Sequence, residues 1–198
     1  QLQGNPGLQV QQGTLELASG QIWSQNPANY SDYVGRYAGD NGTLILSGDS
    51  IFTRSNSYLY VGSDAGSLGT FIIRDNATFW GNYRLSLGNS AGSTGIVHQT
   101  GGLVRLGSDT YIGASGVGLY DLSGGLVTNF VTYIGVNNEG RGVLYQSGGA
   151  FRALGTTVIG NNLGSVGAYY QTGGTYYGSN QLQIAAQSGS YGYFQMSG

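Results

Sequence analysis

The stretch GVLYQSGGAFRALGTTVIG, residues 142–160, places a polar Gln146 and two adjacent glycines directly after a short apolar run. Related phrases occur three more times, at residues 95–106, 118–129 and 167–178. Self-similarity at a regular spacing is the signature of a repeat architecture, in which one unit cannot bury its apolar face alone. The stretch therefore predicts a protein made of stacked repeats.

Two sets of glycines give the length of the repeat. One glycine opens each phrase, and this set is Gly13, Gly42, Gly69, Gly95, Gly118, Gly142, Gly167 and Gly192. Another glycine closes each phrase of the type Tyr-apolar-Gly, and this set is Gly35, Gly62, Gly88, Gly113, Gly135 and Gly160, with Ala185 in the next slot. Both sets recur every 22–29 residues along the 198-residue chain.

Each repeat contains three short stretches with an apolar residue at every second position, which is the pattern of half-buried strands. The inward positions of the first stretch begin with Leu15, Leu44, Phe71, Val97, Tyr120, Leu144, Tyr169 and Phe194. Those of the second stretch are Ile22, Ile51, Val104, Val127, Phe151 and Tyr176. Those of the third stretch are Val34, Val61, Leu87, Ile112, Ile134 and Ile159.

No segment shows a sustained helical period, so we predict an all-β parallel β-solenoid, or β-helix, of about seven coils with three short strands each. We expect one domain over residues 1–198. Its first coil (1–41) is irregular, its repeats are regular over 42–190, and its terminal coil (191–198) is incomplete.

The paired glycines are interpreted as corners between strands, because glycine adopts positive φ without a clash of its Cβ. They are Gly101 and Gly102, Gly124 and Gly125, Gly148 and Gly149, and Gly173 and Gly174. The glutamines Gln99, Gln146 and Gln171 point inward beside these corners. We expect them to form a ladder of side-chain amides, each donating to the next coil and interrupted by Leu122. Ligand binding is the alternative role.

Composition excludes several classes of function. Hydrophobic residues make up 39% of the chain, which is too many for a disordered polar tract. A net charge of −2 without any lysine gives no basic footprint for nucleic acid or anionic lipid. The chain has no cysteine and one histidine, His98, so we expect neither a metal site nor a cofactor. No apolar run approaches the roughly 20 residues of a membrane-inserted helix.

Three phrases, at residues 59–79, 110–129 and 132–151, resemble the autotransporter and PEP-CTERM-associated repeats of bacterial surface proteins. The pattern of that family is Y-[IV]-G, a short loop, G-x-G, an alternating strand and S-G-G. The resemblance covers nearly the whole chain and is clearest over 58–178. It implies an extracellular β-solenoid passenger or a surface stalk. The start at Gln1, without a signal peptide, fits a processed or excerpted secreted chain.

The acidic residues are scattered along the chain. A β-solenoid enzyme that acts on acidic polysaccharides needs paired carboxylates or a Ca²⁺ cluster with a basic residue nearby. The best candidate is Asp49 with Asp75 at one corner of neighbouring coils, beside Arg74, and a solvated corner is the favoured alternative. His98 points outward and has no nucleophile beside it, so we expect a solvated surface residue. We therefore predict that the protein is not an enzyme.

Outward aromatic residues form columns on the surface. One column is Tyr33, Tyr60, Tyr111 and Tyr133, a second is Tyr145 and Tyr170, and Trp23 and Tyr177 point outward on the second stretch. Exposed aromatic rows form protein interfaces or platforms for sugar rings, and they also stabilise a rod by stacking between coils. The sequence leaves these three roles open.

The two ends of the solenoid are predicted to complement each other, since LQV at 8–10 matches LQI at 182–184. We expect chains to stack end to end, because a contact that does not close generates a filament. The interface residues would be Gln1, Leu8, Val10, Leu15, Phe194, Met196 and Gly198. An excerpt of a longer solenoid is the alternative.

The predicted function is a structural subunit of an extracellular or cell-surface fibre whose partner is a further copy of the chain. The alternatives are an adhesin that binds surface glycans through the tyrosine columns and a polysaccharide-degrading β-helix enzyme.

Overall fold

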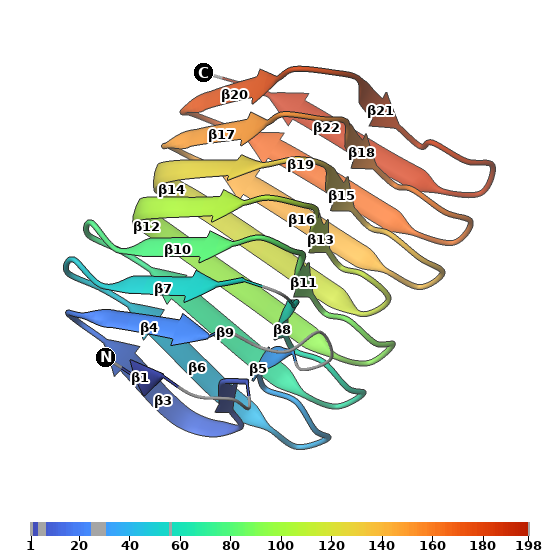
Figure 1. The fold of residues 1–198 in the computed structure, drawn as a ribbon. Coiled ribbons are helices and arrows are strands. Elements are labelled where there is room, and N and C mark those ends of the chain that lie inside the picture. The colour runs from blue at the N-terminus through green and yellow to red at the C-terminus, as the bar shows by residue number, and fades with distance from the viewer. Residues whose placement is uncertain (1, 4–6, 25–30, 56, 198) are drawn as a thin grey trace.

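The computed structural model describes residues 2–3, 7–24, 31–55 and 57–197, and these residues form a rod of stacked coils (Figure 1). The N-terminal strands lie at one end of the rod and the C-terminal strands at the other. The strands pair in parallel, and the described residues include no helix, and hence none that could cross a bilayer. The chain is therefore an all-β parallel β-solenoid of about seven turns, as the repeats predict.

The strands form three faces of the rod, because a 14-stranded sheet bends at a corner and an eight-stranded sheet closes the third side. The first face contains β3 (Gln12–Leu17), β6 (Asn41–Leu46), β9 (Leu68–Ile73), the first halves of β12 (Thr94–Leu106) and β14 (Val117–Asn129), β16 (Arg141–Gln146), β19 (Val166–Gln171) and β22 (Tyr191–Met196). The second face contains β1 (Leu2–Gln3), β4 (Gln21–Ser24), β7 (Ile51–Arg54), β10 (Thr78–Gly81), the second halves of β12 and β14, β17 (Ala150–Ala153) and β20 (Thr175–Gly178). The third face contains β2 (Gln9–Val10), β5 (Asp32–Val34), β8 (Leu59–Val61), β11 (Leu85–Leu87), β13 (Thr110–Ile112), β15 (Thr132–Ile134), β18 (Thr157–Ile159) and β21 (Leu182–Ile184).

The predicted repeats are the coils of this solenoid. The opening glycines form one register column along the first face, from Gly13 in β3 to Gly192 in β22. Beside this column, the inward residues of successive coils stack into one continuous apolar core. Leu44, Phe71 and Val97 are fully buried within it. Stacking is what gives strands of three to six residues enough buried surface to be stable.

One core position differs from the prediction. Ile51 is 38% exposed, and Phe52 fills the inward slot instead, in register with Ile22 and Phe79. The corner between Leu46 and β7 contains one residue more than the later double-glycine corners, and this extra residue shifts the alternation by one. A shift of one residue turns a strand's outward set inward.

The two glycines of each corner pair serve different purposes. Only the second glycine is left-handed, as in Gly125 with a φ of 79°. The first glycine, Gly124, has no such backbone requirement, but a Cβ there would lie 2.3 Å from the carbonyl oxygen of Thr100 in the preceding coil. The prediction that both glycines supply positive φ is therefore wrong for the first of each pair. Asp75 takes the left-handed position in an earlier coil, with a φ of 59°.

A buried ion pair lies inside the N-terminal half of the rod. Arg54 points inward two residues after Phe52 and pairs with Asp32 of β5, and both side chains are at most 1% exposed. Burial lowers the pKa of Arg54 to about 10, so its guanidinium stays charged at neutral pH. Buried charges persist only when they are paired. The repeat pattern does not predict this pair, because the expected register places Arg54 on the surface.

Candidate functional site

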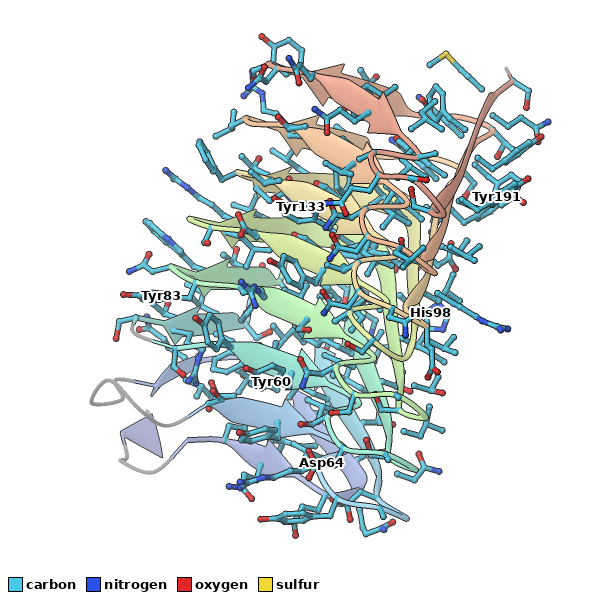
Figure 2. The ribbon with its side chains drawn as sticks, turned by 90° about the vertical axis from the view of Figure 1, so that its right-hand side faces the viewer. Tyr60, Asp64, Tyr83, His98, Tyr133 and Tyr191 are labelled. Carbon is cyan, nitrogen blue, oxygen red and sulfur yellow. The ribbon has the colours of Figure 1, made fainter. Side chains whose placement is uncertain are left out.

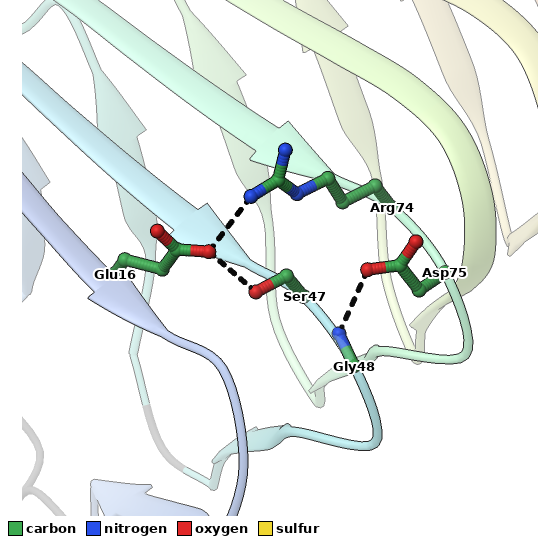
Figure 3. A network of polar contacts seen from close by, with 5 residues as sticks. All are labelled: Glu16, Ser47, Gly48, Arg74 and Asp75. Carbon is green, nitrogen blue, oxygen red and sulfur yellow. Dashed lines mark hydrogen bonds and ion pairs between the residues drawn. The ribbon is translucent and has the colours of Figure 1, made fainter.

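The corner predicted as the best catalytic candidate is a set of contacts that link three coils (Figure 3). Asp75 Oδ2 accepts the backbone N–H of Gly48 at 2.9 Å. Arg74 Nη2 donates to Glu16 Oε1 at 2.8 Å, and Ser47 Oγ donates to the same oxygen at 2.6 Å. These hydrogen bonds, first from Ser47 and then from Arg74, lower the pKa of Glu16. The arginine thus faces Glu16 rather than Asp75, and the corner is occupied by structural contacts.

The remaining polar candidates also have simple partners. Asp49 Oδ1 accepts a hydrogen bond from Asn76 Nδ2 at 3.2 Å. His98 Nδ1 lies 3.2 Å from Asp121 Oδ2, which is its register partner on β14, and both side chains are more than one third exposed. An ion pair this exposed contributes little to stability. Within residues 2–3, 7–24, 31–55 and 57–197, no group of three or more His, Cys, Asp or Glu side chains could hold a metal ion.

Gln99 and Gln146 bridge coils, but through partners other than those predicted, and Gln171 donates to the Gly174 carbonyl in its own coil. Gln99 Nε2 donates to the backbone carbonyl of Leu126 in the next coil at 3.3 Å, and its Oε1 accepts from the Tyr120 hydroxyl at 2.6 Å. Gln146 repeats this arrangement with the Tyr169 hydroxyl. The predicted amide-to-amide ladder is therefore replaced by bonds to backbone and tyrosine. The three glutamines, Gln99, Gln146 and Gln171, are buried.

Burial has a clear effect on these two tyrosines. Their hydroxyl groups lie in the core, and desolvation raises the pKa of both Tyr120 and Tyr169 well above the usual value. A buried phenol must stay neutral and hydrogen-bonded. The glutamine oxygens supply those acceptors, so Gln99 and Gln146 have a structural explanation that does not require a ligand.

The tyrosines of the third face form the predicted register column, interrupted by Ser86 (Figure 2). The Tyr33 and Tyr60 rings stack with their centroids 5.4 Å apart, and the Tyr111 and Tyr133 rings meet edge to face at 5.1 Å. These rings point outward but are half-buried, because they cover one another. The four tyrosines therefore point outward as predicted, and their ring contacts match the predicted stacking between coils.

The second predicted aromatic column lies on the first face. Tyr145 is 39% exposed, and Tyr170 is its half-buried register partner in the next coil. On the second face, Tyr177 is 52% exposed, as predicted, and the side chain of Trp23 lies outside the described part of the structure.

A groove on the second face was missed by the sequence analysis. It has a volume of about 480 Å³, and Arg105, Thr128 and Arg152 lie along it. These three residues occupy one outward register column through β12, β14 and β17. Alternation alone predicts that each points outward, since Val104 and Phe151 beside them are core residues. The groove itself depends on the turn residues that flank the strands, which alternation does not place.

The C-terminal edge of the rod leaves its inward columns uncovered. Leu182, Ile184 and Met196 are 38%, 48% and 63% exposed. One coil earlier, Thr157 and Ile159, the register partners of Leu182 and Ile184, are fully buried, and Gln171, the partner of Met196, is 6% exposed. Residues 153–198 contain no charged residue. This edge is therefore apolar and neutral.

Of the interface residues predicted from the sequence, Met196 is exposed at this edge, and the others that the structure describes are less exposed. Val10 is 7% exposed, and Leu8, Leu15 and Phe194 are half-buried against the core. Gln1 and Gly198 lie outside the described residues.

Comparison of the chain with models of protein families, with curated proteins and with solved structures returns no match.

Proposed function

We propose that the chain is a structural rod that assembles end to end with copies of itself into an extracellular or cell-surface fibre. In this assembly the N-terminal coil of one chain covers the C-terminal edge of the next. The strands β1, β2 and β3 would pair with β20, β21 and β22 of the neighbouring copy, each on its own face. The observation that carries the proposal is the uncovered apolar edge formed by β20, β21 and β22.

The chemistry of this edge favours pairing. Exposed sheet edges present unpaired N–H and C=O groups, and soluble proteins usually protect them with charges, proline or bulges. The last charged residue of the chain is Arg152, and both prolines lie in the first 27 residues. The strands β20, β21 and β22 therefore carry neither a charge nor a proline. The contact joins two different ends of the chain, so it is heterologous. Because both ends have the same three-faced cross-section, each added copy presents a new free end, and the contact repeats without closing.

The other surfaces support a structural role rather than catalysis. At the best catalytic candidate, Asp75 accepts a backbone N–H and Arg74 is held by Glu16. The extracellular location rests on the resemblance to surface-protein repeats. Tyr145, with its ring 39% exposed, supports a second candidate function, an adhesin that binds glycans along the first face.

The test of the proposed function is to charge the edge. Ile184→Lys and Met196→Asp place a charge where the neighbouring coil would bury it, which is strongly unfavourable. Val117→Lys is the matched control, because Val117 is 47% exposed and opens β14 in the middle of the rod, several coils from either end. Sedimentation velocity over a range of concentrations should show growing particles for the wild type and for the control, and single rods for the two edge variants.

Two results would contradict the proposal. The first is a wild-type protein that stays a single rod at every concentration. The second is an edge variant that assembles as well as the Val117→Lys control.

A further inference from the structure

The second face carries an unusual column of outward side chains along the rod axis. Trp80, Arg105, Thr128, Arg152 and Tyr177 follow one another in register, one per coil. The Arg105 guanidinium lies 4.9 Å from the centre of the Trp80 ring, and that of Arg152 lies 5.1 Å from the Tyr177 ring. Along this column the two arginines lie between the two aromatic residues, and Thr128 lies between the two arginines. The strands of this face cross the front of the rod in Figure 1.

The groove of about 480 Å³ follows the middle of this column. Leu126 belongs to the neighbouring outward column of the same face, and Phe130 and Leu154 follow the ends of β14 and β17. These three side chains are 36%, 54% and 46% exposed. The groove thus combines apolar walls with two cationic groups. Apolar side chains concentrated around charged groups on an exposed surface mark an interaction site.

The two groove arginines differ from Arg54 and Arg74 in their partners. Arg54 and Arg74 are paired with carboxylates. Across the part of the chain that the structure describes, no carboxylate lies within ion-pair distance of Arg105 or Arg152. No residue that lines the groove is acidic. The groove is therefore a locally positive surface on a chain whose net charge is −2.

We propose that this groove binds an acidic polysaccharide, with its chain along the rod axis and its carboxylate or sulfate groups on Arg105 and Arg152. The planar guanidinium donates paired hydrogen bonds to such anions. Phe130 lines the groove and offers apolar ring surface to a sugar ring, and Trp80 and Tyr177 extend the column beyond the groove at its two ends. The backbones of the two arginines are two coils apart, which is about 9.6 Å at the usual spacing between strands. An extended sugar chain along the rod axis can therefore place separate anionic groups on the two side chains.

A polysaccharide fits this surface better than a nucleic acid does. Nucleic-acid binding depends on neutralising many phosphates, and such proteins carry a broad basic surface. Here only two cations lie in the groove. The inference is independent of end-to-end assembly, because the groove lies on the side of the rod. In a fibre, the groove would recur in every subunit and raise the binding strength by multivalency.

The experiment is isothermal titration calorimetry with three probes of equal length. They are a carboxylated oligouronate, a sulfated oligosaccharide and a neutral oligoglucan. We expect binding of the acidic probes, weakened by added salt, and no binding of the neutral one. The acidic probe that binds more tightly identifies the anion, and either answer supports the proposal.

The variant Arg105→Gln/Arg152→Gln should lose about 100-fold in affinity, since each charged hydrogen-bonding group contributes about tenfold or more. Arg141→Gln is the matched control, because Arg141 is exposed on the first face, and its affinity should match the wild type. Thermal unfolding of both variants would verify that the rod is intact.

Three results would overturn the proposal. The neutral oligoglucan binds as tightly as the acidic probes, the double variant keeps wild-type affinity, or single-stranded DNA binds more tightly than either acidic probe. None of these depends on whether the rods assemble into fibres, so the proposed function is tested separately.

Discussion

Alanine substitutions at three glycines separate the two demands that the corners place on the chain. Gly39 lies in an exposed turn with a φ of 85°, and an added Cβ would meet no atom within 4 Å. At Gly124 the backbone is not left-handed, but a Cβ would lie 2.3 Å from the Thr100 carbonyl oxygen. Gly125 combines both problems, with a φ of 79° and a Cβ 2.4 Å from the carbonyl oxygen of Gly101. Gly39→Ala therefore tests the strain of a left-handed backbone, Gly124→Ala tests the clash of a Cβ with the neighbouring coil, and Gly125→Ala tests both together.

The structure gives an order for the losses in stability. A left-handed alanine costs about 1–2 kcal/mol, which is the whole expected effect of Gly39→Ala. Forcing a methyl group into a packed site costs about 1–3 kcal/mol, and Gly124→Ala should reach the upper part of that range because the atom in the way is backbone. Gly125→Ala should lose the sum, about 3–5 kcal/mol.

Urea unfolding followed by circular dichroism measures these losses as changes in the free energy of unfolding. The comparison holds only if each variant keeps the wild-type slope of the unfolding free energy against urea concentration. The explanation of the paired glycines would be refuted by a Gly124→Ala variant that loses no more stability than Gly39→Ala. It would also be refuted by a Gly125→Ala variant that loses no more than Gly39→Ala.

Two further predictions concern buried polar groups. Arg54→Met should destabilise the rod by about 3–5 kcal/mol, because it leaves the Asp32 carboxylate buried without its cation. In urea unfolding, the double variant Asp32→Leu/Arg54→Met should recover most of this loss. A double variant that is no more stable than Arg54→Met would contradict the role of the ion pair. Burial raises the pKa of Tyr120 above its ordinary value of 10.0. Above pH 10 the Tyr120 hydroxyl is therefore deprotonated in the unfolded chain but still protonated in the folded chain, and the free energy of unfolding falls by about 1.4 kcal/mol per pH unit. Tyr120→Phe should remove this contribution to the fall in unfolding free energy with pH. At neutral pH it should cost about 1–2 kcal/mol, because the Gln99 side-chain oxygen loses its hydrogen-bond donor. If the dependence of stability on pH between 10 and 11.5 were unchanged in the variant, the predicted role of Tyr120 would be contradicted.

The fold could be predicted because each coil repeats the same alternation. The inward columns through Val34 and Leu44 are where that pattern places them, since burial on one face of a strand fixes its register. The pattern was wrong at Ile51, where one extra corner residue moved Phe52 inward. The same shift concealed the buried Arg54, which the incorrect register placed on the surface.

The surface sites could be predicted only in part. Alternation places the tyrosine columns on the outside, but it does not indicate that Tyr33 and Tyr60 cover each other. The groove depends on Phe130 and Leu154, which follow the strands in turns and whose positions no period describes. Side-chain contacts between coils decide both features, and these require the three-dimensional structure.

Electron cryomicroscopy of the purified chain, without added partner, tests the central claim most directly. The account predicts filaments in which β1, β2 and β3 of one chain pair in parallel with β20, β21 and β22 of the next, so that Ile184 and Met196 become buried. Single rods whose C-terminal edge stays uncovered, or closed dimers joined through two C-terminal edges, would contradict it.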